Sequence, residues 1–219
     1  MELQHVNVKL FLENPDQVNL ETLIPIFHSW IQNQATGDLL LDVADYRHVP
    51  SGPGIILIGH QGNYSLDNTG GRLGVRYNQK AVIEGTDQDR LGEATRAALA
   101  ACRRLETEPR LEGTVRFNGR EVEVTINDRL LAPNTAETRA AAEAEFRVFF
   151  SKLFGDSEYV VTYGNDPRGL FLIHATTTQA FDTATLLNNL DSLVPPSPAI
   201  DGNSPTQEPV RPPRSAAPF

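Results

Sequence analysis

Residues 39–60, LLLDVADYRHVPSGPGIILIGH, combine two apolar runs with a loop rich in proline and glycine. The runs Leu39–Tyr46 and Ile55–His60 predict the two strands of a hairpin, because large apolar residues favour strands, whereas proline and glycine favour turns. A second stretch, residues 158–175, EYVVTYGNDPRGLFLIHA, repeats this order. In both stretches a tyrosine closes the first run, the loop contains proline, and a glycine precedes the second run.

A strand pattern and an amphipathic helix pattern precede each of the two hairpins. The strand patterns are VNVKLFL at residues 6–12 and VEVTIND at residues 122–128, where apolar residues alternate along the chain. The order β-α-β-β therefore occurs twice, over about residues 5–60 and 115–175, and predicts an internal duplication. The expected fold class is α+β, with a mostly antiparallel sheet and about three helices on one face.

Two local motifs lie between the first hairpin and the second strand pattern at residues 122–128. Asn118-Gly119 predicts a tight turn between a strand at residues 115–117 and a return strand at residues 122–126, because this dipeptide favours two-residue hairpin loops. Thr86 and Asp89 have the spacing of a capping box, which predicts the start of a helix in this region.

The composition divides the chain into a body and a tail. We expect residues 1–180 to form a single domain and residues 181–194 to form a short helix that docks on it. Residues 195–219 hold eight of the fifteen prolines and few large apolar side chains, which predicts a disordered tail. Within this tail PVRPPR, residues 209–214, is typical of a ligand for a proline-binding groove, although a purely solvated tail is the simpler interpretation.

Three segments carry a resemblance to a known family. They are LIPIFHSWIQNQ at residues 23–34, DLLLDVADYRHVPSGPGIILIGHQGNYSLD at residues 38–67, and INDRLLAPNTAET at residues 126–138. The chain resembles, over about residues 5–175, a family of bacterial conserved proteins of unassigned function. The resemblance implies a bacterial cytosolic protein, and it brings no activity, cofactor or catalytic residue.

Charge and cysteine content exclude several classes of protein. The net charge is −9 and the isoelectric point is near 5.0, which disfavours binding to nucleic acids and anionic membranes. The single cysteine, Cys102, excludes an internal disulfide and a cysteine zinc site. No signal peptide pattern and no run of about 20 apolar residues is present in the sequence, so we expect a cytoplasmic protein.

The first hairpin contains the strongest candidates for a functional site. The candidate residues are Asp42, Asp45, Arg47, His48 and His60. An aspartate–histidine pair would orient the imidazole and raise its pKa for acid–base chemistry. If Tyr46 pairs with Ile55, then Asp42 faces Gly59, whereas a slip of one residue places Asp42 opposite His60. The alternative is an ordinary polar pair on a solvent-facing side of the sheet.

Other kinds of chemistry have little support in the sequence. The five histidines show no metal-ligand spacing, and no nucleophile motif accompanies them. The glycine-rich loops lead into strands, whereas phosphate-binding loops lead into helices. We therefore expect no metal and no cofactor.

Two hypotheses for the function remain. The first is a non-catalytic protein that binds a protein partner or assembles with itself. The connection at residues 126–134, INDRLLAPN, favours it, because the apolar pair Leu130 and Leu131 predicts burial under a partner or under the first repeated unit. The second is a small-molecule-binding or hydrolytic protein that uses the polar residues of the first hairpin.

Overall fold

The computed structural model describes residues 1–192, so the predicted tail and the last two residues of the predicted docking helix lie outside the described residues. Eight strands form one antiparallel sheet in the order β2-β3-β4-β5-β1-β6-β8-β7. The strands are β1 (Val6–Leu12), β2 (Leu40–Tyr46), β3 (Gly54–Gly59), β4 (Gly62–Asp67), β5 (Gly74–Gln79), β6 (Phe117–Ile126), β7 (Tyr159–Tyr163) and β8 (Phe171–Thr177). The described residues also contain four α-helices, α1 (Leu23–Gln32), α2 (Asp87–Glu106), α3 (Ala136–Phe154) and α4 (Thr183–Asp191). The predicted α+β class and the antiparallel sheet are confirmed.

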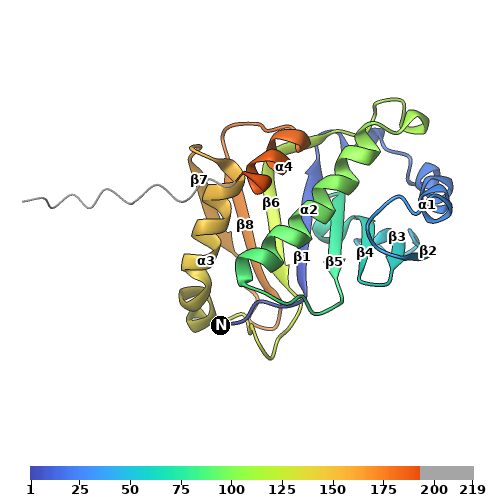
Figure 1. Ribbon diagram of the computed structural model, residues 1–219. Helices are drawn as coiled ribbons and strands as arrows, with labels where there is room; N and C mark the ends of the chain where they lie inside the picture. The colour runs from blue at the N-terminus through green and yellow to red at the C-terminus, as the bar shows by residue number, and fades with distance from the viewer. Residues whose placement is uncertain (193–219) are drawn as a thin grey trace, which may run out of the picture.

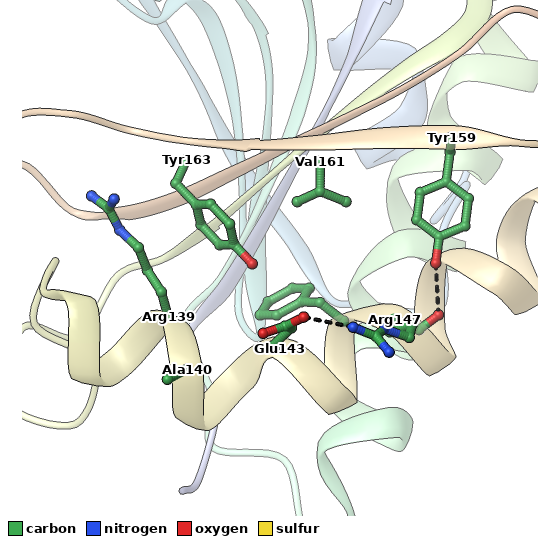
Figure 2. Close-up of a pocket in the computed structure, with 8 residues that line it drawn as sticks. Arg139, Ala140, Glu143, Arg147, Tyr159, Val161 and Tyr163 are labelled. Atoms are coloured by element: carbon green, nitrogen blue, oxygen red, sulfur yellow. Dashed lines mark hydrogen bonds and ion pairs between the residues drawn. The ribbon is translucent and has the colours of Figure 1, made fainter.

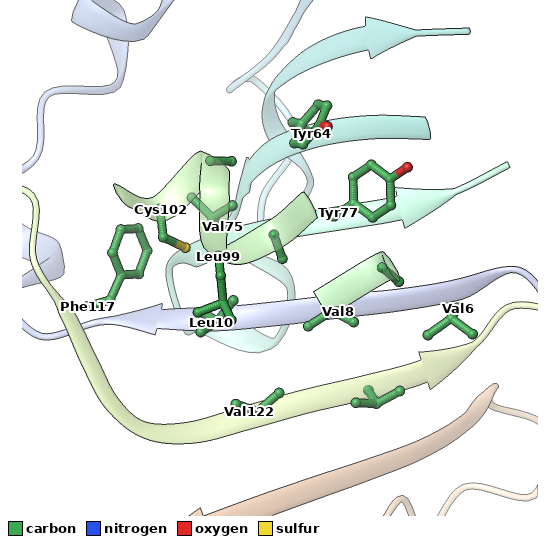
Figure 3. Packing of buried hydrophobic residues seen from close by; sticks show 14 of the residues in the cluster. Val6, Val8, Leu10, Tyr64, Val75, Tyr77, Leu99, Cys102, Phe117 and Val122 are labelled. Carbon is green, nitrogen blue, oxygen red and sulfur yellow. The ribbon is translucent and has the colours of Figure 1, made fainter. Parts of the chain in front are cut away.

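The helices and one face of the sheet enclose the apolar core. Helices α2, α3 and α4 lie on the same face, and α1 packs on β2 and β3 near one end of the sheet (Figure 1). Val6, Val8 and Leu10 of β1 point from the middle of the sheet towards α2, which contributes Leu99 and Cys102 (Figure 3). All five side chains are buried, so the alternating apolar residues of β1 form the centre of the core.

Local capping chemistry sets the start of the two long helices. The Thr86 side chain accepts a hydrogen bond from the Asp89 backbone, and the Asp89 side chain accepts one from the Thr86 backbone, which confirms the predicted capping box of α2. Thr135 caps α3 by accepting a hydrogen bond from the Thr138 backbone. Helix α3 ends at Gly155, whose φ of 59° lies in the left-handed region that glycine tolerates best.

The predicted turn at Asn118-Gly119 is wrong, because both residues lie inside the continuous strand β6. Leu10 of β1 faces Val122, but Leu12 faces Phe117, so β6 carries additional residues between these two pairs. Gly119 has a φ of 58°, and Asn118 Oδ1 accepts a hydrogen bond from the Arg120 backbone. Asparagine and glycine favour hairpin turns because they adopt unusual backbone conformations easily. Here the same property allows a β-bulge within the strand.

The sheet order bears on the predicted duplication. Strands β1 and β6 are adjacent in the middle of the sheet, with β5 on the outer side of β1 and β8 on the outer side of β6. The hairpin β4–β5 therefore occupies the place in the first half of the sheet that β7–β8 occupies in the second half. The sequence pattern matches β7–β8 with β2–β3 instead. The hairpin β2–β3 instead extends the sheet beyond β4. The duplication stays a prediction.

Candidate functional site

Asp45 and Arg47 of the first hairpin lie together on the surface. The Arg47 guanidinium donates two parallel hydrogen bonds to the Asp45 carboxylate, of 3.0 Å from Nε and 2.7 Å from Nη2, and its Nη1 lies 2.8 Å from Glu21. The hydrogen bonds from Arg47 lower the pKa of Asp45 to about 2. The hydrogen bonds to Asp45 and Glu21 in turn raise the pKa of Arg47. Arg47 therefore fastens the loop after β2 to the segment that precedes α1.

The remaining hairpin candidates are not brought together. Asp42 faces Ile58 across the strands, so neither of the two registers considered from the sequence is formed. The pairing of Tyr46 with Gly54 sets this register, and the exposed His60 lies beyond the last pair of the hairpin, Leu40 with Gly59. The ring of His48 stacks on Tyr46 with 6.1 Å between the ring centroids. None of the five candidates lines either of the two cavities described below.

The sheet face opposite the helices holds a buried ion pair that the sequence pattern did not indicate. Strand β1 was expected to bury one face only, but all of its residues are buried. The Nζ of Lys9 lies 2.6 Å from Asp67 Oδ1 and 3.2 Å from the Thr69 carbonyl oxygen, and the exposed fractions of Lys9 and Asp67 are 1% and 2%. Burial lowers the pKa of Lys9, and the hydrogen bond to Asp67 opposes this shift.

Further ion pairs extend the network across the same face. Arg76 Nη2 lies 2.8 Å from Glu123 Oε1, and Arg72 and His174 both contact the Glu121 carboxylate. Burial favours a higher pKa for Glu121, but the hydrogen bonds and charges of Arg72 and His174 outweigh it and lower the pKa. Counting Lys9 and Asp67, three fixed cations on this face balance three carboxylates, so it offers no net attraction for an ion.

Three buried side-chain atoms on this face have no hydrogen-bond partner among the described residues. They are Asn7 Oδ1, Asn63 Oδ1 and Ser65 Oγ. Asn63 and Asn7 both pair with Asn78 of β5, so three asparagines form one row across neighbouring strands. The sequence holds one signal for this face, because polar residues alternate with apolar ones in β1, β4, β5 and β6. It does not show which of these strands are adjacent.

Helix α3 and the edge strand β7 border a cavity of about 460 Å³ (Figure 2). Tyr159 and Tyr163 point into it from β7, and Arg139, Glu143 and Arg147 line it from α3. The Tyr159 hydroxyl donates a hydrogen bond of 3.1 Å to the Arg147 carbonyl oxygen, whereas the Tyr163 hydroxyl has no hydrogen-bond partner among the described residues. The spacing of four between the α3 residues places them on one helix face, which is a signal that the sequence does contain.

A second cavity of about 770 Å³ lies next to the first, and the two share Tyr159. Its lining includes the last turns of α3, the start of β7 and the end of β8. Asp156 and Glu158 line it, and neither forms an ion pair with any described residue. We call these two neighbouring cavities the tyrosine groove.

The connection between β6 and α3 presents two leucines to solvent. Leu130 is 96% exposed and Leu131 is 45% exposed. The expectation that they are buried under the first repeated unit is therefore wrong, and burial under a partner stays a prediction. We call residues 127–134 the Leu130 loop.

No family model matches the chain, and no curated protein matches it at a significant level. Among residues 1–192, no group of three or more histidine, cysteine or acidic side chains is arranged to hold a metal ion. None of the helices in this part of the chain combines the length and the apolar character needed to span a bilayer.

Proposed function

We propose that this is a non-catalytic protein that binds another protein chain through the Leu130 loop. The observation that carries the proposal is the near-complete exposure of Leu130 on a loop whose backbone is held in place. A leucine that becomes fully buried in an interface contributes about 1.5–3 kcal/mol. Single exposed leucines are common on protein surfaces, and what distinguishes Leu130 is the way in which its loop is held.

Hydrogen bonds and a buried anchor fix the conformation of the Leu130 loop. The Asp128 carboxylate accepts hydrogen bonds from the backbone of Leu130 (2.9 Å) and Leu131 (3.0 Å), and the Ala132 backbone donates to the Asp128 carbonyl oxygen (2.8 Å). Ala132 is fully buried, and Pro133 bridges to Leu170 beside β8. Because the loop is ordered before a partner arrives, binding loses little conformational entropy.

The alternative, a small-molecule-binding or hydrolytic site in the first hairpin, has less support. Arg47 is the strongest anion-binding group of that hairpin, and its guanidinium is already paired with Asp45 and Glu21. His60 and Asp42 lie apart. These contacts account for the polar residues as the means by which the loop is held.

A site-specific photo-cross-linker tests the proposed function. The full chain would carry benzoylphenylalanine in place of Leu130, and a matched control would carry it in place of Val82, which is 64% exposed and lies far along the chain from the loop. On irradiation in extracts of the source cells, we expect one discrete product from position 130, and loss of that product when Leu131→Asp is added. A product of twice 24.1 kDa would identify the partner as a second copy of this chain.

Two outcomes would contradict the proposal. One is the absence of any product from position 130. The other is the same set of products from positions 130 and 82, since that would show contact without a specific surface.

We also infer that the two halves of the sheet derive from an internal duplication with boundaries other than those expected from the sequence. The support is the matching order of elements, in which β1 and β6 are each followed by a helix, an antiparallel hairpin and a second helix. In this interpretation β2–β3 is an addition to the first half.

A further inference from the structure

The tyrosine groove has two walls of different chemistry. On the β7 wall, Tyr159, Val161 and Tyr163 are alternate residues of the strand, so their side chains share the face that lies towards α3 (Figure 2). On the α3 wall, Glu143 and Arg147 are paired with each other at 2.6 Å. Strand β7 is the last strand of the sheet, so the groove runs along an edge that no other described strand covers.

Grooves with these features suit proline-rich segments. Proline rings pack on tyrosine faces, and a free tyrosine hydroxyl donates a hydrogen bond to a carbonyl oxygen of the bound chain. The Tyr163 hydroxyl is available for this role, because it has no partner among residues 1–192. Proline also has a fixed φ angle, so a proline-rich segment loses less conformational entropy when it is bound than other segments do.

The charges at one end of the groove match a segment of this chain. Asp156 and Glu158 line the second cavity without an ion-pair partner in the described part of the chain. The segment PVRPPR, residues 209–214, places Arg211 and Arg214 among three prolines. With the prolines against the tyrosines, the two guanidinium groups lie within reach of two unpaired carboxylates.

The point at which the described chain ends also lies near the groove. Helix α4 ends at Asp191, and Asn189 Nδ2 donates a hydrogen bond of 2.9 Å to the Leu153 carbonyl oxygen in the last turns of α3. Ser151 and Gly155, on either side of Leu153, line the second cavity. Residues 193–208 are 16 residues long and can span about 50 Å, which is more than the distance along a 19-residue helix.

We propose that the tyrosine groove binds residues 209–214 of the same chain. The prolines contact Tyr159 and Tyr163, and the arginines pair with Asp156 and Glu158. Because the segment is tethered to the body, its effective concentration at the groove reaches the millimolar range, so even weak contacts keep the groove occupied. This inference is independent of the function proposed for the Leu130 loop, which lies at the other end of α3.

Paramagnetic NMR on the full chain tests the proposal. A nitroxide spin label is attached to Ser215→Cys, and the amide signals of β7 are compared with those of β2 at the opposite edge of the sheet. Cys102 does not interfere, because it is fully buried and burial raises the pKa of its thiol. We expect the label to remove most of the β7 signal intensity and to leave β2 unchanged.

A charge-reversal variant in the tail provides the matched control. Arg211→Glu combined with Arg214→Glu changes no residue of the body, so the fold is not at risk, and we expect it to restore the β7 signals. Tyr163→Ala is expected to restore them as well, with the β2 signals reporting that the sheet is intact. Equal broadening of β7 and β2, or broadening that survives the charge reversal, would overturn the proposal.

A mixing experiment distinguishes the same chain from a second copy. Isotope-labelled protein without the nitroxide is mixed with spin-labelled protein that carries no isotope. Loss of β7 signals in the mixture means that the tail binds another copy, which contradicts the proposed contact within one chain. We expect the mixture to show no such loss.

Discussion

Val8 and Lys9 are neighbours in β1, yet each belongs to a row of side chains of the opposite character. Val8 lies in a row of apolar and aromatic residues that continues across the strands through Leu57, Tyr64, Tyr77, Val124 and Ile173. Lys9 lies in the next row, which consists of Ser65, Arg76, Glu123 and His174. Helices cover the face of the sheet to which Val8 points (Figure 1, Figure 3). Because side chains alternate along a strand, the row of Lys9 points to the opposite face.

The apolar row is buried, whereas the polar row is buried at Lys9 and Ser65 and half-buried at its other members. Different interactions stabilise the two rows. The apolar row is stabilised by removal of its surface from water, which needs only shape and volume. The polar row depends on specific partners, because an ion taken out of water without its counter-ion is strongly destabilising. Substitutions of Lys9 and its ion-pair partner should therefore be strongly coupled, whereas a substitution on the apolar face should be close to additive with one on the polar face.

The largest effect is expected for Lys9→Met, which leaves Asp67 buried without its ammonium partner. We expect a loss of about 3–5 kcal/mol in the free energy of unfolding. Urea unfolding at pH 7 followed by the fluorescence of Trp30, the only tryptophan and a buried one, measures it. The control is the double variant Lys9→Met/Asp67→Asn, which removes both charges and should recover most of the loss. A double variant as unstable as the sum of its single changes would show that the pair is not coupled.

Leu10→Ala tests the apolar side of the same strand. We expect a loss of about 3 kcal/mol, because the substitution removes buried methyl groups and leaves a cavity under α2. The same urea titration applies. Combination with Lys9→Met should be close to additive, and a large interaction energy between these two sites would mean that the two faces are not independent.

A smaller loss in the free energy of unfolding is expected for Glu121→Gln on the polar face, and this loss should depend on pH. Since the pKa of Glu121 in the folded protein is lower than its usual value, the carboxylate stabilises the fold above that usual value, near 4.5. This stability is lost as the pH falls through the lowered pKa. The wild type should therefore lose its advantage over Glu121→Gln between pH 6 and pH 3 in urea titrations. A constant difference across this range would contradict the assigned role of Arg72 and His174.

Leu130→Ser should change stability least, by no more than about 0.5 kcal/mol, because the side chain is almost completely exposed. Thermal unfolding of the full chain measures this change. A clear destabilisation would show that Leu130 packs on the body, and it would weaken the argument that the exposed side chain serves a partner.

Several local features of the fold were readable from the sequence, although the turn at Asn118-Gly119 was not, and the long-range features were not readable. The capping box at Thr86 and Asp89 and the paired strands on either side of short loops depend on residues that are close in the chain. The placement of β1 between β5 and β6 depends on contacts across about 70 and about 115 residues, which no local pattern encodes. For the same reason the sequence does not show which charged side chains lie together in the row of Lys9.

The candidate sites show the same division. The exposed leucines were singled out from the sequence because an apolar pair in a loop is unusual. The hairpin residues were singled out by their chemistry, but the pairing of Tyr46 with Gly54 places Asp42 opposite Ile58, and this register depends on the geometry of the loop, which the sequence pattern did not resolve. The tyrosine groove lies between α3 and β7, which are joined by the short connection 155–158. Both elements are predicted from the sequence, so their proximity could have been predicted as well.

The central position of β1 has a consequence for synthesis on the ribosome. Strand β1 leaves the ribosome before both of its partners, so it is unpaired until β5 has been made, and its second edge stays open until β6 follows about 40 residues later. During that interval an apolar strand with unpaired edges is exposed, which is the condition under which nascent chains associate wrongly. Lys9 and Asn7 place polar groups on that strand in the meantime, and polar side chains on an open strand disfavour wrong pairing. Lys9, which forms the buried ion pair of the finished protein, is thus expected to have a second role during synthesis.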